Sequence, residues 1–243
     1  MAKIPNSPEE IFEEFVADYQ QAFGDKLEAI ILYGSGARGE YVPKKSDINF
    51  LIVLTDEGIE QLDLALTLIP KWRKRNVSVP LFLTKTYIQS ALDSFPIEFF
   101  NMKNAHKLVF GTDVLKDLQI NEKDLRLQIE RELRGKLIHL REGFLNTAHD
   151  RRQLTQLLSA TLPTFASIFS SLLYLKHQEI PSNKEKIFTQ IAENFGLRDE
   201  VFKTLLALRN GSWKGNKEEL KSFALSYIKE IKKLVEIVDQ MAL

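Results

Sequence analysis

The chain has 243 residues, of which 44% are hydrophobic and 27% are charged, a composition typical of a globular protein with one large domain or two small ones. Lys plus Arg and Asp plus Glu both number 33, so the net charge is zero and no overall field would attract nucleic acid or an anionic membrane. The lack of cysteine excludes disulfides, thiolate zinc sites and a cysteine nucleophile, and it leaves oxygen-ligated metals such as Mg²⁺ open.

The N-terminal segment MAKIPNSPEE contains no apolar stretch of signal-peptide length, and no run approaches the roughly 18 apolar residues of a membrane span. We therefore expect a cytoplasmic protein without a membrane partner. The hydrophobic period changes near residue 115, because short β-rich runs precede it and long helical patterns follow it. This change predicts two domains, residues 1–115 and residues 116–243.

The first predicted element is a helix that begins at Ser7 and ends at Gly24. Ser7 fits an N-cap, Pro8 a first-turn proline and Glu10 the partner of a capping box. Apolar residues at helical spacing follow, and they predict one buried face.

Short apolar runs bounded by turn residues predict the strands of a sheet. Two runs rich in Ile, Leu and Val are typical of buried strands, at residues 27–33 and 48–54. Further strand candidates follow at residues 77–84, 97–102 and 107–110.

A helix is expected over about residues 57–75, between the second and third strands. The densest basic cluster of the chain, residues 71–75, ends this helix. Cations favour the C-terminal turn of a helix, so we explain the cluster in that way and expect no nucleic-acid partner.

The second half of the sequence predicts a helical bundle, because apolar residues recur there at helical spacing. Five helices are expected, at residues 121–146, 152–176, 183–195, 199–208 and 217–241. Pro163 should kink or split the second of them, since proline lacks an N–H and crowds the preceding turn.

The connection between the first two strands carries the predicted chemistry. Gly34 and Ser35 follow the first strand, and Asp47 and Asn49 open the second. Gly34 allows the backbone to turn closely around a phosphate, and the Ser35 hydroxyl with nearby N–H groups can bind the terminal phosphates of a nucleotide. Residues two apart on a strand point to the same face, so the side chains of Asp47 and Asn49 should converge beside this turn.

This Gly-Ser pair, the spacer over residues 36–46 and the alternation of Asp47 and Asn49 with apolar residues resemble the signature of the nucleotidyltransferase superfamily. The resemblance implies an α+β fold, in which a nucleotidyltransferase-like mixed β-sheet with flanking helices is followed by an all-α helical bundle, as in aminoglycoside nucleotidyltransferase-like proteins. It also implies that two carboxylates hold Mg²⁺, which neutralises the triphosphate and stabilises the leaving pyrophosphate. Asn49 replaces the second carboxylate, and its amide oxygen can ligate Mg²⁺ but adds no charge.

In the superfamily a third carboxylate usually lies on a later strand and acts on the attacking hydroxyl. The predicted strand at 77–84 contains no acid, so Glu98 is the nearest substitute; its other interpretation is an exposed residue on a half-buried strand. Arg38 is close enough in sequence to assist a phosphate, or it is a solvated arginine. Ser46 completes the candidate nucleotide-binding residues, although it is better interpreted as a turn residue that fixes the entry to the strand.

Two other motifs suggest competing functions. Gly34, Gly36 and Gly39 match the dinucleotide fingerprint, but residues 40–46 are too few for the helical crossover of that fold. In the helical half, an arginine followed a few residues later by His139 is similar to the motif of HEPN-type domains, which are often paired with small nucleotidyltransferases in toxin–antitoxin systems. A single histidine in an Arg/Glu-rich helix is more commonly structural or exposed.

The sequence thus predicts a nucleotidyltransferase-fold protein that binds a nucleoside triphosphate with Mg²⁺ and, if active, transfers a nucleotidyl group to a hydroxyl of a small molecule or protein. Asp47, Asn49 and Glu98 are the expected catalytic residues, and Asp47 and Asn49 the expected metal ligands. The alternative is a catalytically inactive relative that acts as a binding or interaction module, including a toxin–antitoxin-like role. The acceptor, the preferred base and the formation of a homo-oligomer stay open.

Overall fold

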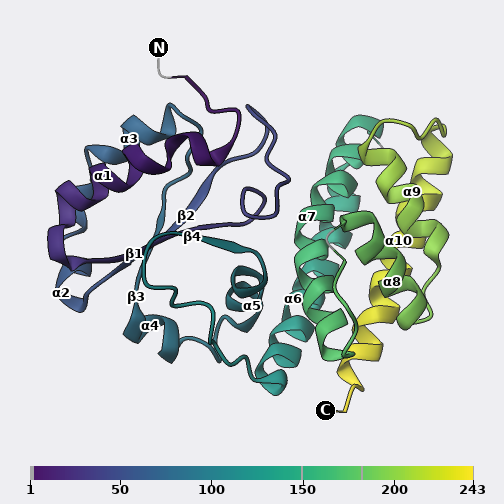
Figure 1. The fold of residues 1–243 in the computed structure, drawn as a ribbon. Coiled ribbons are helices and arrows are strands. Elements are labelled where there is room, and N and C mark those ends of the chain that lie inside the picture. Colours follow the sequence, from purple (N-terminus) through teal and green to yellow (C-terminus); the bar gives the residue numbers. More distant parts are fainter. Residues whose placement is uncertain (1–2, 149, 182, 243) are drawn as a thin grey trace. The chain divides into compact units, whose positions relative to one another are not determined.

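The computed structural model describes residues 3–148, 150–181 and 183–242, and the chain divides into two units, Met1–Ile120 and Asn121–Leu243 (Figure 1). The sequence placed the boundary earlier, after residue 115. Leu118 accounts for the difference, since its side chain is 2% exposed in a core of the first unit. The segment after residue 115 therefore belongs to the N-terminal unit.

The N-terminal unit is built around a mixed sheet with the strand order β3-β2-β1-β4. The strands are β1 (Leu27–Tyr33), β2 (Asn49–Leu54), β3 (Leu81–Thr84) and β4 (His106–Gly111). β1 pairs antiparallel with both β2 and β4, whereas β2 pairs parallel with β3. Because β1 and β2 are antiparallel neighbours, the dinucleotide-binding fold suggested by the glycine pattern is excluded.

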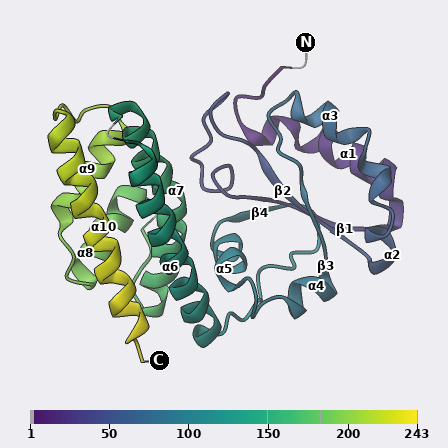
Figure 2. The ribbon, with the colours of Figure 1, turned by 180° about the vertical axis from the view of Figure 1, so that it is seen from behind.

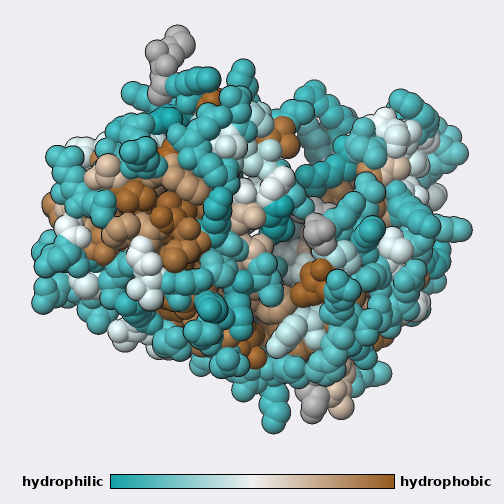
Figure 3. Space-filling view, viewed as in Figure 1, coloured by the Kyte–Doolittle hydropathy of each residue, from teal (hydrophilic) through white to brown (hydrophobic). Residues whose placement is uncertain are grey.

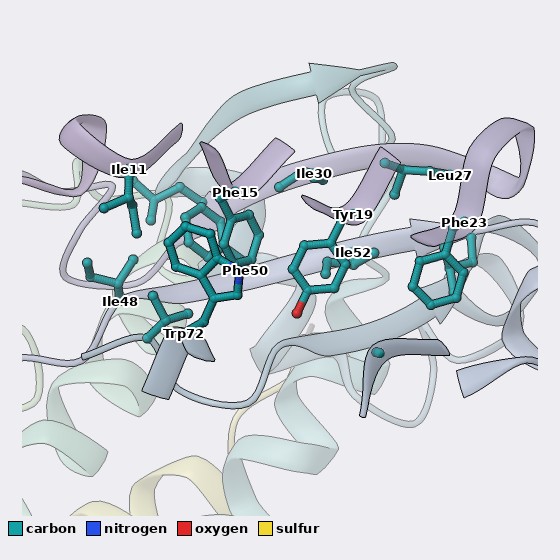
Figure 4. Close-up of a cluster of buried hydrophobic side chains, with 14 residues drawn as sticks. Ile11, Phe15, Tyr19, Phe23, Leu27, Ile30, Ile48, Phe50, Ile52 and Trp72 are labelled. Carbon is teal, nitrogen blue, oxygen red and sulfur yellow. The ribbon is translucent and has the colours of Figure 1, made fainter. Parts of the chain in front are cut away.

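Helices α1 (Phe12–Phe23) and α3 (Leu68–Arg73) lie on one side of the sheet (Figure 1). Figure 4 shows their aromatic side chains packed against the strands. The ring of Phe15 on α1 stacks on Phe50 of β2 with 4.1 Å between centroids, and it meets Trp72 of α3 edge-on at 4.9 Å. The indole N–H of Trp72 donates to Asp18 Oδ2 at 2.9 Å, which satisfies the buried polar atom of this ring.

The basic cluster at residues 71–75 takes part in this packing. Lys71 forms ion pairs with Asp18 at 2.6 Å and Glu14 at 3.0 Å, and Arg75 also pairs with Glu14. The cluster thus joins α3 to α1 within the unit.

On the face seen in Figure 3, hydrophobic residues of this unit gather in a patch beside α1.

The other side of the sheet is covered by α4 (Lys85–Ser90) and α5 (Pro96–Asn104), as Figure 2 also shows from behind. The prediction of a strand at residues 97–102 is therefore wrong. Pro96 occupies the first turn of α5, where its missing N–H costs nothing, and its fixed φ favours the helix. The run after it is buried at Ile97, Phe99, Phe100 and Met102, which lack the strict alternation of a half-buried strand.

The predicted helix at residues 57–75 is broken into three short pieces, α2 (Asp56–Ile59), η3 (Leu62–Ala65) and α3. Gly58 lies inside α2, where glycine disfavours a helix, and it is packed so closely that an added Cβ would lie 3.0 Å from the Lys26 side chain. Beyond α3, the predicted strand at 77–84 shortens to β3, which begins directly after Pro80. Val77 keeps only an isolated bridge to Ile48.

The N-terminus of the first helix also differs from its prediction. Residues Pro8–Ile11 form a 3₁₀ turn, η1, before α1 begins, and Ser7 makes no side-chain capping bond, so the predicted capping box is absent at this position. A second 3₁₀ turn, η2 (Gly24–Lys26), follows α1, and Gly24 ends the helix with φ of 56°.

The second unit consists of α6 (Glu122–Asn146), α7 (Arg151–Leu175), α8 (Lys184–Asn194), α9 (Asp199–Arg209) and α10 (Lys217–Asp239) (Figure 1). Aromatic side chains from four of these helices form its centre: Phe165, Phe169, Phe188, Phe202 and Tyr227. α7 runs through Pro163 as one helix, so the predicted split does not occur.

α7 is also long and apolar enough to cross a membrane by length and composition, with a mean hydropathy of 1.4 over an 18-residue window. Within the described residues 56% of that window is buried inside the unit. Its buried side chains pack against the neighbouring helices, as those of a central bundle helix do.

Candidate active site

The chain turns sharply where β1 ends. Gly34 has φ of 75°, in the left-handed region that favours glycine, and an added Cβ would lie 3.4 Å from Asn49 Nδ2. The turn is closed by the N–H of Arg38, which donates to Gly34 O at 3.2 Å, and by that of Glu40, which donates to Ser35 O at 2.9 Å. Gly34 thus lets this turn approach the side chain of residue 49.

Asp47 and Asn49 stand at the entry to β2, directly beside this turn. Alternation along the strand places their side chains on the face of Leu51, which is the face covered by α4 and α5. Asp47 is exposed and Asn49 is half-buried. Tyr33 lies opposite Asn49 in the ladder, and burial raises the pKa of its phenol.

The side chain of Asn49 is held by Ser78, a residue that the sequence did not single out. Ser78 Oγ donates to Asn49 Oδ1 at 2.7 Å, while Asn49 Nδ2 donates weakly to the carbonyl oxygen of Asp47 at 3.5 Å. Ser78 itself is fixed by its backbone N–H, which donates to Ile48 O at 3.0 Å. The sequence alone does not indicate this role of Ser78, because its segment meets the start of β2 through a tertiary bridge between Val77 and Ile48.

Ser46 lies in the turn that leads into the strand. Its hydroxyl accepts a hydrogen bond from Val42 N at 3.2 Å, and its own N–H donates to Val42 O at 2.9 Å. Its carbonyl oxygen accepts a bond from the Asn76 side chain. These contacts favour the interpretation of Ser46 as a turn residue over that of a phosphate ligand.

The other two phosphate candidates lie in the turn after β1. Ser35 is half-buried. The guanidinium of Arg38 forms an ion pair with Glu40 at 3.3 Å, so part of its charge is already balanced. The sequence predicts either a solvated arginine or a phosphate ligand at position 38. In the structure the Arg38 side chain is instead paired with a neighbouring carboxylate.

Glu98 does not lie on a strand, as the sequence had suggested. It is an exposed residue in the first turn of α5, on the helix that covers the same face of the sheet as Asn49. The prediction of a strand around Glu98 is therefore wrong, because residues 97–102 are helical, and its role as a third carboxylate stays a prediction.

The oxygen donors gathered here do not fit a resident metal centre. They are the Asp47 carboxylate, the Asn49 amide oxygen and the Ser78 hydroxyl, and together they carry a single negative charge. The Asn49 oxygen already accepts a bond from Ser78. Among the described residues, no group of three or more histidine, aspartate or glutamate side chains is placed to hold a metal ion. Of the two carboxylates that the resemblance implied, only Asp47 is present.

The HEPN-like motif on α6 forms no site among the described residues, because its arginine and His139 contact different partners. Arg134 on α6 pairs with Glu130 at 2.8 Å and with Asp239 at 2.9 Å. His139 lies on the same helix with its side chain 75% exposed, near Glu142. These are surface ion pairs of the bundle.

No protein-family model matches the chain, and no curated protein matches it. Among solved structures, the chain is similar to a spectinomycin adenyltransferase from Enterococcus faecialis, whose structure contains ATP and spectinomycin. The TM-score is 0.55, the identity is 16%, and the match covers 93% of this chain and 100% of that chain. At this identity the similarity shows the fold alone, and it confirms the α+β fold with a helical C-terminal region that the sequence predicted.

Proposed function

We propose that the N-terminal unit binds a nucleoside triphosphate at the turn after β1. The observation that carries this proposal is the junction of Gly34 with the entry to β2. The positive φ of Gly34 brings the turn against Asn49, and Asp47 shares the same face. A tight turn of this kind directs backbone N–H groups at phosphate oxygens. The similarity in fold to an adenyltransferase that was solved with ATP supports the choice of ligand.

Ser35 and Gly34 are the residues we assign to the phosphates, with Arg38 beside them. Mg²⁺ accompanies a nucleoside triphosphate as part of the ligand, and Asp47 is the carboxylate we assign to that ion. The donor set does not provide for a second, resident metal ion.

Calorimetric titration of the natural protein with ATP and Mg²⁺ tests this assignment. Asp47→Ala should weaken binding by about tenfold or more, the value of one charge-assisted contact. Asp25→Ala is the matched control, because Asp25 is an exposed carboxylate before β1, at the opposite end of that strand from Gly34. Equal affinities in the two variants would refute the assignment.

A second candidate is transfer of the nucleotidyl group to a hydroxyl of a small molecule. The similar structure, a spectinomycin adenyltransferase, contains spectinomycin together with ATP, and the match covers 93% of this chain. Asn49 weighs against it, since loss of the second carboxylate weakens the binding of Mg²⁺, the ion that would stabilise the charge of the leaving pyrophosphate.

Incubation with labelled ATP and spectinomycin distinguishes a binding protein from a transferase. A binding protein produces no labelled acceptor, and the Asn49→Asp variant gains transfer if the lost charge is the cause. Robust transfer by the natural protein would establish the second candidate and remove the interpretation as an inactive relative.

A further inference from the structure

The contact between Asn49 and Ser78 determines which end of the Asn49 amide faces the turn. Ser78 Oγ lies 2.7 Å from Asn49 Oδ1, within the range of a good O–H···O bond. The same hydroxyl lies 3.3 Å from Ile48 O, which is a weaker alternative acceptor. Ser78 therefore engages the oxygen of the amide and turns its nitrogen away.

The nitrogen end of the amide lies beside the turn after β1. Asn49 Nδ2 is 3.5 Å from the carbonyl oxygen of Asp47, and it is the atom nearest to the position of a Cβ on Gly34, at 3.4 Å. An amide oxygen in this place would face another acceptor, so the two contacts agree on the orientation. The bond to Asp47 is at the limit of hydrogen-bond length, which leaves an N–H donor of Asn49 available to a ligand.

An aspartate at position 49 would behave in the opposite way. Both its oxygens accept hydrogen bonds and carry negative charge, so a phosphate could approach it only with a metal ion between them. Asparagine presents a donor at the same place without that charge. A donor aimed at a phosphate oxygen forms a charge-assisted bond, which is stronger than a bond between neutral groups.

We propose that Asn49, positioned by Ser78, donates a hydrogen bond directly to a phosphate of the nucleotide, so that binding persists without Mg²⁺. The inference rests on the proposed function, since it concerns the same site. Ser78 acts here as a positioning residue: it holds the amide oxygen and thereby directs the N–H groups. The pair thus presents an uncharged donor at the position where the resemblance implies a second metal-binding carboxylate.

The test is the affinity for ATP, measured by calorimetry in Mg²⁺ and again in EDTA. The natural protein should still bind ATP when EDTA replaces Mg²⁺, with a loss of about tenfold that corresponds to the contact between Mg²⁺ and Asp47. Asn49→Asp keeps the shape of the side chain but should lose about tenfold to a hundredfold more in EDTA, the value of one charge-assisted bond, and Mg²⁺ should restore it. Asp47 is unchanged in both proteins, so its charge cancels from the comparison.

Variants of Ser78 test the positioning role. Ser78→Ala frees the amide and should reduce the affinity in EDTA severalfold, whereas Ser78→Thr keeps the hydroxyl and should preserve it. Ser90→Ala is the control, because Ser90 also donates its hydroxyl to a carbonyl oxygen, on α4. Circular dichroism and thermal melting establish that each variant is folded.

The outcomes separate the inference from the proposed function. ATP binding by the natural protein in EDTA, weakened by Asn49→Asp, supports the inference. Binding that requires Mg²⁺ in the natural protein overturns the inference and leaves the proposed function standing. Failure to bind ATP in either condition overturns the proposed function and the inference with it.

Discussion

Asparagine and aspartate have nearly the same shape, and at position 49 the difference between them is one of charge and hydrogen-bond role. The Asn49 amide accepts a bond from Ser78 through its oxygen and carries its N–H groups beside Gly34. The fold accommodates either asparagine or aspartate at position 49, because the strand pairing of this residue with Tyr33 involves the backbone. One substitution can therefore alter the chemistry of the site while the sheet is retained.

Gly34→Ala should weaken ATP binding, because its Cβ would enter the space beside Asn49. Gly39→Ala is the control: its φ of 73° matches the 75° of Gly34, but nothing lies within 4 Å of an added Cβ. Both variants should lose about 1 kcal/mol of stability from backbone strain, measured by urea denaturation. Only Gly34→Ala should lose affinity, and a similar loss in both would contradict the role of Gly34.

Glu230 on α10 is a buried carboxylate that supports the start of α9. Burial opposes its ionisation, but hydrogen bonds from the N–H and the guanidinium of Arg198 outweigh this effect, and the pKa of Glu230 is lowered from its ordinary 4.5. Its side chain is 5% exposed. Glu230→Gln should therefore cost about 1–3 kcal/mol of stability at neutral pH, the value of a hydrogen bond to a charged group.

The effect of Glu230→Gln should depend on pH in a defined direction. A lowered pKa in the folded state means that the stabilisation is fully present above the ordinary value of 4.5 and is lost as the pH falls through the folded value. Denaturation of both proteins from pH 7 to pH 3 should show the difference in unfolding free energy shrinking at the acid end. A constant difference would show that the carboxylate charge has no role.

At the scale of elements, the hydrophobic period predicted most of the fold. The continuous apolar runs of β1 and β2 and the long amphipathic helices are regular enough to be recognised without tertiary information. The segments that failed are those whose structure depends on packing. The apolar pattern of residues 97–102 fits a buried strand or a buried helix equally well. Packing against the sheet favours the helix, α5.

The candidate site was predictable only in part, because one of its residues is brought in by tertiary packing. Gly34, Asp47 and Asn49 are recognisable from their spacing along one hairpin. Ser78 joins them through the parallel pairing of its segment with residue 48, which no local pattern reveals. Glu98 is an acid at a suitable distance along the sequence, but sequence distance does not show that it lies on a helix, α5.

Pro163 in α7 offers a test of local backbone energetics. It is exposed, so Pro163→Ala removes little packing, and alanine restores the N–H that an interior helical residue should donate. The variant should be more stable by about 1–3 kcal/mol, measured by chemical denaturation. Thr164→Ala is a neighbouring control on the same helix. A less stable Pro163→Ala variant would mean that the proline supports a bend which the unit needs.

At the scale of the whole molecule, each unit has its own buried core. The sheet of the N-terminal unit is covered on both sides, and the aromatic centre of the helical unit lies within the bundle. The boundary of the first unit depends on Leu118, which fills the core below the sheet. Stability of the two parts should therefore be separable.

Expression of residues 1–120 alone should give a folded unit, whereas residues 1–115 should be less stable by about 1.5–3 kcal/mol, because that fragment lacks the buried Leu118. Urea denaturation followed by circular dichroism measures the difference. Residues 121–243 should also fold alone, with a helical spectrum. Equal stability of the fragments 1–115 and 1–120 would contradict the placement of residues 116–120 in the first core.

The central claim is that a nucleotide binds at the turn after β1, and nuclear magnetic resonance of the full chain during ATP titration tests it most directly. The account predicts saturable shifts of the backbone amides over residues 34–39 and at Asn49 and Ser78. The Asn49 side-chain amide should also shift, since it is assigned as a phosphate donor. Saturable shifts confined to the helical unit, or no shifts at all, would contradict the account.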